Sequence, residues 1–240
     1  MLILGHRGAA HPQAPENSLA AVELALLAGA DGVEVDVRLT ADGVPVCHHD
    51  ASLRRTAGDP RFVSTLRYDE LATIGLHRIP LLSEVIDLVE GRGRLIIDVK
   101  TAAAAAWPAG ECMDAVAAVL RRQRPSLVTV SSFDRPRILQ LRQTGVLVRT
   151  ALLGRPGLPL GVLLRRALRD GHEEAHPYVS DLLAGLDLVE PARRRGLCVT
   201  GWTVNEVQDL RRLAGARVAG VITDDPVSAR LALRPALVPA

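Results

Sequence analysis

Two short segments carry charged side chains at every second position of an apolar run. In Gly32-Val33-Glu34-Val35-Asp36-Val37 the acidic residues alternate with valines, and in Ile97-Asp98-Val99-Lys100 the charged residues alternate with aliphatic ones. Residues two apart on a β-strand point to the same face, so the charges of each segment share a face. Because charges inside a protein core are costly unless they are paired or bind a metal ion, this pattern predicts an ionic site.

The three carboxylates of these segments suggest a divalent cation. Glu34, Asp36 and Asp98 would carry excess negative charge beside a single lysine, and a cation relieves that excess best. Ligation by oxygen atoms alone, without cysteine, favours Mg²⁺ or Ca²⁺ over zinc. We therefore predict a Ca²⁺ or Mg²⁺ site at these residues. Lys100 is the sole lysine of a chain with 28 arginines, which makes its place beside Asp98 notable.

Two histidines stand next to charged residues, in Gly5-His6-Arg7-Gly8 and in His48-His49-Asp50. An imidazole with an ordinary pKa near ~6.5 transfers protons well at neutral pH, so we predict that His6 and His49 act as general acid and base. The guanidinium of Arg7 can hold a phosphate with two hydrogen bonds, and Lys100 adds a second point charge. These residue types together indicate phosphate chemistry.

The elements that position these residues alternate along the whole chain. Short apolar runs and helical patterns follow one another, which predicts βαβ units around a parallel sheet. The length of 240 residues is close to the ~250 of a typical TIM (β/α)₈ barrel, so we predict one such domain over residues 1–240. In this fold the active site lies at the carboxyl ends of the strands. The predicted strands are 2–6, 32–38, 94–100, 127–132, 146–151, 177–180, 197–202 and 218–223.

Residues 39–80 interrupt the alternation and predict a small insertion after the second strand, opened by a hairpin turn at Asp42-Gly43. The alanine-rich stretch 101–111 is expected to be a loop or short helix over the top of the barrel. Helix caps are predicted at Asn17, at Asn205 in a capping box with Gln208, and at Asp225 before Pro226. Asp224 is interpreted as a turn or cap residue.

Composition excludes several classes of protein. The net charge is +2 and no basic run is interleaved with aromatic residues, so nucleic acid is not an expected partner. The three cysteines are far apart, which argues against a zinc site or a disulfide framework and for reduced thiols. Neither a signal peptide nor an apolar stretch of ~18 residues is present, so we expect a cytoplasmic protein without stable membrane association. The sequence leaves the oligomeric state open.

The motifs taken together resemble the glycerophosphodiester phosphodiesterase family over residues 2 to about 228. That resemblance implies a TIM barrel, a Ca²⁺ or Mg²⁺ ion, and hydrolysis to glycerol 3-phosphate and an alcohol. It implies Glu34, Asp36 and Asp98 as metal ligands, His6 and His49 as proton-transfer residues, Arg7 and Lys100 as phosphate contacts, Phe133 and Trp202 as pocket lining, and Glu16 as support. The motifs are Gly5-His6-Arg7-Gly8, Pro15-Glu16-Asn17-Ser18, Gly32 to Val37, Asp42-Gly43 with His49-Asp50, Asp98-Val99-Lys100, Trp202-Thr203-Val204-Asn205 and Thr223-Asp224-Asp225-Pro226.

Two positions depart from the pattern of the family. Asp98 stands where a glutamate is usual, which concerns the affinity for the metal and the choice of ion, and His48 stands where an apolar residue is usual. Trp202 also fits the alternative role of core packing. The remaining histidines lack a strand-end context and are interpreted as ordinary loop or surface residues: His11, His77, His172 and His176.

Two other functions remain open beside a glycerophosphodiester substrate. One is a lipid phosphodiesterase, such as a lysophospholipase D or a relative of the phosphatidylinositol-specific phospholipases C. Such an enzyme needs an exposed apolar rim, and this chain has few aromatic residues to form one. The other is a non-catalytic sensor of glycerol phosphates, against which the presence of both histidines argues.

Overall fold

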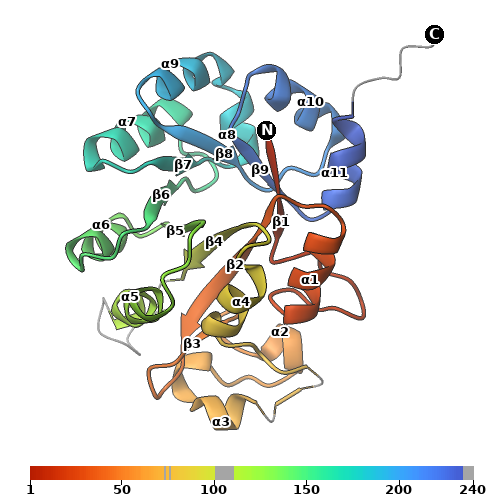
Figure 1. The fold of residues 1–240 in the computed structure, drawn as a ribbon, viewed down its shortest axis with the longest axis vertical. Coiled ribbons are helices and arrows are strands. Elements are labelled where there is room, and N and C mark those ends of the chain that lie inside the picture. The colour runs from red at the N-terminus through yellow and green to blue at the C-terminus, as the bar shows by residue number, and fades with distance from the viewer. Residues whose placement is uncertain (73, 76, 101–110, 235–240) are drawn as a thin grey trace.

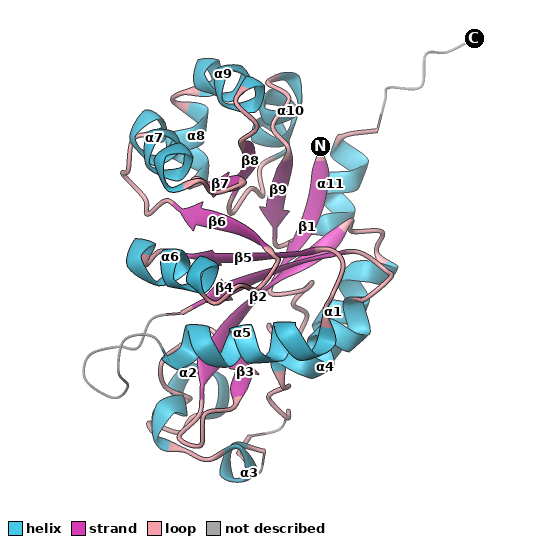
Figure 2. Ribbon diagram, turned by 60° about the vertical axis from the view of Figure 1, so that its left-hand side comes forward, coloured by secondary structure: helices cyan, strands magenta, loops and turns pink. Residues whose placement is uncertain are grey.

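The parallel strands close into a ring in this computed structural model, which describes all residues except 73, 76, 101–110 and 235–240. The order around the ring is β1-β2-β4-β5-β6-β7-β8-β9, and β9 pairs with β1 to close it. Helices follow most strands and surround the ring (Figure 1, Figure 2). The predicted TIM (β/α)₈ barrel is therefore confirmed.

The strands are β1 (Leu2–His6), β2 (Gly32–Leu39), β3 (Pro45–Cys47), β4 (Arg94–Val99), β5 (Val128–Ser132), β6 (Arg149–Leu153), β7 (Glu174–His176), β8 (Cys198–Gly201) and β9 (Gly220–Thr223). The α-helices are α1 (Leu19–Leu27), α2 (Arg54–Ala57), α3 (Tyr68–Leu71), α4 (Leu82–Val89), α5 (Glu111–Gln123), α6 (Arg135–Gln143), α7 (Leu160–Asp170), α8 (Val179–Leu183), α9 (Val189–Arg194), α10 (Val207–Gly215) and α11 (Pro226–Ala232). Within the described ranges, no helix has both the length and the apolar character needed to cross a membrane.

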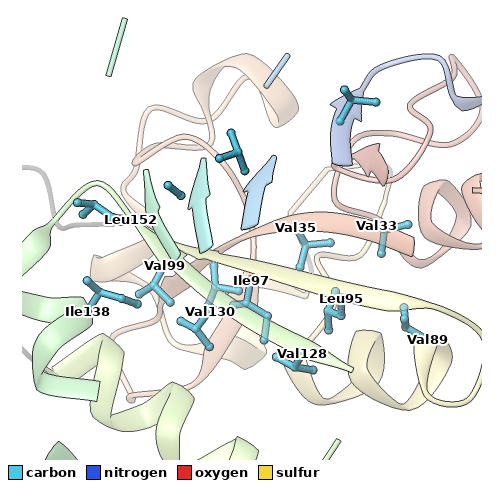
Figure 3. Close-up of a cluster of buried hydrophobic side chains, with 14 of the residues drawn as sticks. Val33, Val35, Val89, Leu95, Ile97, Val99, Val128, Val130, Ile138 and Leu152 are labelled. Atoms are coloured by element: carbon cyan, nitrogen blue, oxygen red, sulfur yellow. The ribbon is translucent and has the colours of Figure 1, made fainter. Parts of the chain in front are cut away.

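Side chains alternate along each strand between the outside of the barrel, which packs against the helices, and its interior. The outward side chains join one large cluster with the helices, as the labelled valines and isoleucines of β2, β4 and β5 do in Figure 3. The inward side chains include a small apolar group of Leu4, Ile96 and Ile222, against which Trp202 packs. Because Val33, Val35 and Val37 belong to the outer cluster, the acidic residues between them face the interior, as the alternation predicts.

The insertion after β2 has a small core of its own. Strand β3 turns back at Gly43, where φ is +77°, and pairs antiparallel with β2. Helices α2 and α3 and the short 3₁₀ helix Val63–Thr65 follow, at the lower end of Figure 1. Their buried apolar residues form a separate cluster: Val46, Leu53, Val63, Leu66 and Leu71. The predicted hairpin at Asp42-Gly43 is confirmed.

The sixth strand of the barrel lies earlier than predicted. It is β7, Glu174–His176, and the predicted segment 177–180 instead contains Pro177 and the start of α8. The reason is that Glu174 and His176 occupy the inward positions of this strand, so it contains no apolar run. The next shift is smaller: the fifth strand, predicted over 146–151, spans Arg149–Leu153.

Two predicted helix caps are also wrong, while a third is confirmed. Ser18, not Asn17, caps α1 by accepting a hydrogen bond from the amide of Ala21, and α10 begins at Val207 with Glu206 at its N-cap, beyond Asn205. Asp225 caps α11 through the amide of Ser228. The prediction for 101–111 lies outside the described residues except for Glu111, which begins α5.

Candidate active site

A cavity of about 220 Å³ lies at the carboxyl ends of the barrel strands. Its volume is below the ~300–1,000 Å³ of sites for drug-sized ligands, so it suits a small molecule. All nine residues singled out in the sequence line it: His6, Arg7, Glu34, Asp36, His49, Asp98, Lys100, Phe133 and Trp202. Four further residues line it as well: Ser131, Leu153, His176 and Ile222.

Three buried carboxylates meet on one side of this cavity. Glu34 and Asp36 lie on β2 and Asp98 on β4, where Asp36 and Asp98 are paired in register. One oxygen of each lies within 4.8 Å of the others, and no side chain of the three is more than slightly exposed. Burial, followed by the charge of Asp36, raises the pKa of Glu34 to about 7. The three carboxylates therefore bring together more negative charge than the neighbouring positive side chains balance.

The donor set fits a divalent cation. Asp98 Oδ1 is buried and has no hydrogen-bond partner in the described part of the chain, although a buried carboxylate oxygen normally has one. Burial also raises the pKa of Asp98 despite the nearby lysine. A hard cation with oxygen ligands would satisfy both conditions.

Lys100 is the counter-charge within the triad. Its Nζ lies 2.7 Å from Asp36 Oδ1 and also contacts Asp98 Oδ2. Burial alone would lower the pKa of Lys100, but Asp98 and Asp36 outweigh it and raise the pKa. Burial likewise would raise the pKa of Asp36, and Lys100 and Arg7 hold it below its usual range. Asp36 and Lys100 are therefore charged together.

Arg7 is placed by acidic residues on both sides. Its Nη1 donates to Glu16 Oε1 over 3.0 Å, and its Nε lies 3.1 Å from Asp36 Oδ2 without hydrogen-bond alignment. The backbone amide of Arg7 also donates to Glu34 Oε2 over 3.1 Å. Glu16 thus supports the site as expected.

Asn17, predicted as a helix cap, is instead tied to Asp36. Its Nδ2 donates to Asp36 Oδ2 and its Oδ1 accepts from the Asp36 amide, each over 2.9 Å. Its φ of +59° bends the chain toward β2. Asparagine tolerates this left-handed conformation better than most residues. Its side chain also has the donor and the acceptor for the two hydrogen bonds to Asp36.

Each of the two predicted histidines is held through Nδ1 by an aspartate. His6 Nδ1 lies 2.6 Å from Asp224 Oδ1, and His49 Nδ1 lies 2.7 Å from Asp50 Oδ1. For the second nitrogen of each ring, Nε2, no hydrogen bond to another described residue is found. Asp224 was interpreted from the sequence as a turn or cap residue. It lies in a bend but caps no helix, because its side chain bonds His6 and receives a hydrogen bond from Asn205 Nδ2.

The two histidines differ in their electrostatic surroundings. Burial lowers the pKa of His6, but the hydrogen bond of Asp224 and the charge of Glu34 outweigh it, so the pKa is raised overall. Burial also lowers the pKa of His49, and there Asp36 and Asp50 do not compensate it. His6 therefore favours the protonated form and His49 the neutral form. An acid and a base at neutral pH need this division.

His48 faces away from the cavity that its neighbour lines. It is buried, and its ring nitrogens contact the Asp50 carbonyl and Thr56 Oγ1 at 2.9 and 3.0 Å. His48 is therefore a structural partner of α2.

Aromatic residues form another part of the cavity wall. Phe133 and Trp202 contact edge to face with ring centres 5.5 Å apart, and Tyr178 contacts the other side of Trp202 at 5.2 Å. The Nε1 of Trp202 donates to the carbonyl of His176 over 3.0 Å. Trp202 therefore both packs with the interior core and lines the cavity.

His176 is not the loop or surface residue that the sequence suggested, whereas His172 lies in a loop as predicted, although its side chain is buried. His176 ends β7, is fully buried and lines the cavity. His172 is buried as well, with its Nδ1 2.9 Å from Thr150 Oγ1, while His11 and His77 are exposed as expected. The sequence places His176 two residues after Glu174, a spacing that puts both side chains on one face of a strand. This was missed because the strand was predicted over 177–180.

Known proteins resemble this chain in sequence and in fold. The model of the glycerophosphoryl diester phosphodiesterase family matches residues 6–228. A glycerophosphodiester phosphodiesterase of Caldanaerobacter subterraneus is 30% identical over 94% of both chains. The crystal structure of the Thermotoga maritima glycerophosphodiester phosphodiesterase superposes with a TM-score of 0.83 at 26% identity, covering 98% of both chains. An Oleispira antarctica phosphodiesterase shares the fold with a TM-score of 0.84 at 24% identity, over 97% of this chain and 96% of that one.

Proposed function

We propose that this chain, which belongs to the glycerophosphoryl diester phosphodiesterase family and is therefore a phosphodiester hydrolase, cleaves glycerophosphodiesters to glycerol 3-phosphate and an alcohol in a metal-dependent reaction. The observation that carries the proposal is one cavity lined by three buried carboxylates and two histidines that aspartates hold. The Oleispira antarctica enzyme was solved in complex with the product sn-glycerol-3-phosphate. A product of that size also suits the small cavity.

Glu34, Asp36 and Asp98 would hold the cation, Mg²⁺ or Ca²⁺. When bound, it neutralises charge that develops on the phosphoryl oxygens. Arg7 would contact the phosphate through the donors that Glu16 leaves free, and Lys100 would add a point charge from inside the barrel. Phe133 and Trp202 would line the pocket for the carbon atoms of the substrate.

His49 and His6 would divide the proton transfers. The neutral His49 accepts a proton from the attacking hydroxyl as the new oxygen–phosphorus bond forms. The protonated His6 gives its proton to the oxygen of the departing alcohol as the old bond breaks. The directions of the two pKa shifts support this assignment.

A coupled assay for release of glycerol 3-phosphate from glycerophosphocholine tests the proposed function. We expect activity with added Mg²⁺ or Ca²⁺, loss of activity in EDTA, and recovery when the ion is restored. Release that persists unchanged in excess EDTA would contradict metal dependence. Binding of glycerol phosphate without any turnover would favour the sensor, and turnover of lysophospholipids alone would favour the lipid phosphodiesterase.

Replacement of Asp224 by asparagine should alter the pH dependence of the reaction. The carboxylate of Asp224 favours the protonated form of His6, so its loss lowers the pKa of His6. The acid then loses its proton at lower pH, and we expect the alkaline limb of kcat/KM to move to lower pH. A pH profile of wild type and Asp224→Asn measures the shift.

Asp225→Asn is the matched control for this experiment. Asp225 is the next residue along the chain, but its side chain caps α11 and does not bond His6. Asparagine is as good a cap as aspartate, so this variant should keep the wild-type profile. An alkaline limb that stays in place in Asp224→Asn would remove His6 from the role of the acid.

Exchange of Lys100 for arginine should impair turnover even though the charge is kept. The ammonium lies largely buried between Asp36 and Asp98, and a guanidinium needs more space and more hydrogen-bond acceptors there. A displacement of the phosphate contact by about 1 Å costs on the order of 10²-fold in rate. Steady-state kinetics after circular dichroism confirms folding measure the loss.

The control exchanges the same residue types at the surface. Arg92 pairs with Glu23 over 2.6 Å on the exterior of the barrel, and such pairs contribute little to stability. Arg92→Lys should therefore leave kcat and KM unchanged. Near-normal kinetics of Lys100→Arg would mean that Lys100 is only the structural partner of Asp98.

Two broader expectations belong to the same proposal. Residues 1–240 are taken as a single domain, since the insertion after β2 is joined to the barrel by the pairing of β3 with β2. The cytoplasm is taken as its location because a small-molecule substrate and unpaired cysteines suit that compartment.

A further inference from the structure

His176 lies across the barrel from the phosphate side of the cavity. In the ring of eight strands β7 is four places from β2 in either direction, so it is the strand opposite Glu34 and Asp36. The cavity-lining residues from β5 to β9 and the segments after them are otherwise aromatic or aliphatic, apart from Ser131. The cavity therefore has a charged half and a mainly apolar half, and His176 belongs to the second.

One ring nitrogen of His176 has a hydrogen-bond partner, and the other has none among the described residues. Nε2 lies 3.1 Å from Glu174 Oε2. Glu174 is charged, because Arg149 Nε lies 2.8 Å and Arg94 Nη1 3.3 Å from its other oxygen. A carboxylate only accepts hydrogen bonds, so Nε2 carries a proton and donates it. In the neutral ring Nδ1 is then an acceptor.

That acceptor has no partner among the residues that the structure describes. The side chain of His176 is fully buried, and its Nδ1 lacks a hydrogen bond. Buried polar atoms are nearly always satisfied, so an exception next to a cavity indicates a ligand. The ring is also fixed in place, because Glu174 holds its side chain and Trp202 Nε1 bonds its backbone carbonyl.

We infer that His176 Nδ1 recognises the glycerol moiety by accepting a hydrogen bond from its terminal hydroxyl, the one farthest from the phosphate. This inference rests on the proposed function, which places the phosphate at the opposite side of the cavity. The carbon chain then runs along the wall that Phe133 and Trp202 form, and its far end reaches β7. His176 is in this view a residue for specificity, distinct from the two histidines that transfer protons.

The experiment compares two diesters that differ by one hydroxyl. The first carries glycerol, and the second carries the analogue that lacks only the terminal hydroxyl. His176→Phe keeps a ring of similar size and removes the acceptor. We expect kcat/KM of this variant to fall about 5- to 100-fold on the glycerol diester, because the hydroxyl is left unpaired in a buried place, and to remain at the wild-type value on the analogue.

Two variants complete the comparison. His176→Gln supplies a side-chain oxygen as acceptor and should restore part of the discrimination, whereas the shorter His176→Asn should not. This pair also keeps the test available if His176→Phe does not fold. The control is His172→Phe, which removes a buried histidine that does not line the cavity and should keep the wild-type preference between the two diesters.

Three results would overturn the inference. They are an equal loss on both diesters, a wild-type enzyme that does not distinguish them, and a variant whose defect is reversed by more Mg²⁺, which would make His176 a metal ligand. A wild-type enzyme without activity on either diester would instead contradict the proposed function. The two failures are therefore separable.

Discussion

Glu34→Gln is expected to lower kcat/KM on the order of 10³-fold and to weaken binding of Mg²⁺ or Ca²⁺, while the barrel stays folded. Glutamine has the shape of glutamate and an oxygen that can bind a cation, but it lacks the negative charge that strengthens this binding. The replacement also removes repulsion within the triad, since burial and Asp36 raise the pKa of Glu34 to about 7. The measurements are turnover across a metal titration and calorimetric binding of the ion.

The stability of the metal-free protein provides the second readout. Because the folded-state pKa of Glu34 lies above its unfolded value, the folded protein binds the extra proton, and its free energy of unfolding falls as pH rises from about 4.5 to about 7. The glutamine of Glu34→Gln does not titrate, so this variant has no such loss of stability. In EDTA at pH 8 it should therefore be at least as stable as wild type by thermal denaturation. Full activity of Glu34→Gln with unchanged metal affinity would rule out the proposed triad.

His6→Ala and His49→Ala are each expected to reduce kcat by roughly 10²–10⁴, but with a different dependence on the substrate. An alcohol leaves slowly without a proton, whereas p-nitrophenolate leaves readily as the anion. His6→Ala should therefore recover much of its rate on a p-nitrophenyl diester, and His49→Ala should not. Equal defects of both variants on both substrates would contradict the division into acid and base.

The source of the attacking hydroxyl can be examined with the same enzymes. We expect the C2 hydroxyl of the substrate glycerol to attack phosphorus first and water to open the cyclic phosphate afterwards. A diester of 2-deoxyglycerol should then be a very poor substrate of the wild type. Hydrolysis of this diester at the normal rate would exclude the cyclic route and leave the roles of the histidines intact.

The parts of the barrel that sequence predicted best are those with strict alternation. In β2 and β4 the valines and isoleucines alternate with charged residues, so the apolar side chains must face the helices and the charged ones the interior. The outer cluster contains Val33, Val35, Ile97 and Val99 as expected. The charges then had to meet inside. The alternation, together with the order of the motifs, identified nine of the thirteen residues that line the cavity.

The predictions from sequence were wrong where polar side chains face the interior of a strand or contact residues far away along the chain. Glu174 and His176 face the interior of β7, so the strand has no apolar run and the prediction moved to the segment after it. Asn17, Asn205 and Asp224 are residue types typical of caps and turns, but their partners are Asp36, Asp224 and His6. Contacts between residues so far apart along the chain leave no local pattern, and a three-dimensional structure is needed to find them.

Closure of the ring also sets the order in which the enzyme can become competent during synthesis. His6 and Asp224 are 218 positions apart in the sequence, and β1 meets β9 only when the last strand is in place. A nascent chain that has folded as far as β8 would hold the acidic triad and His49, yet its His6 would lack the aspartate that favours its proton. Such long-range pairing is slow compared with local folding. A chain that ends before Asp224 therefore lacks the contact that favours the protonated form of His6.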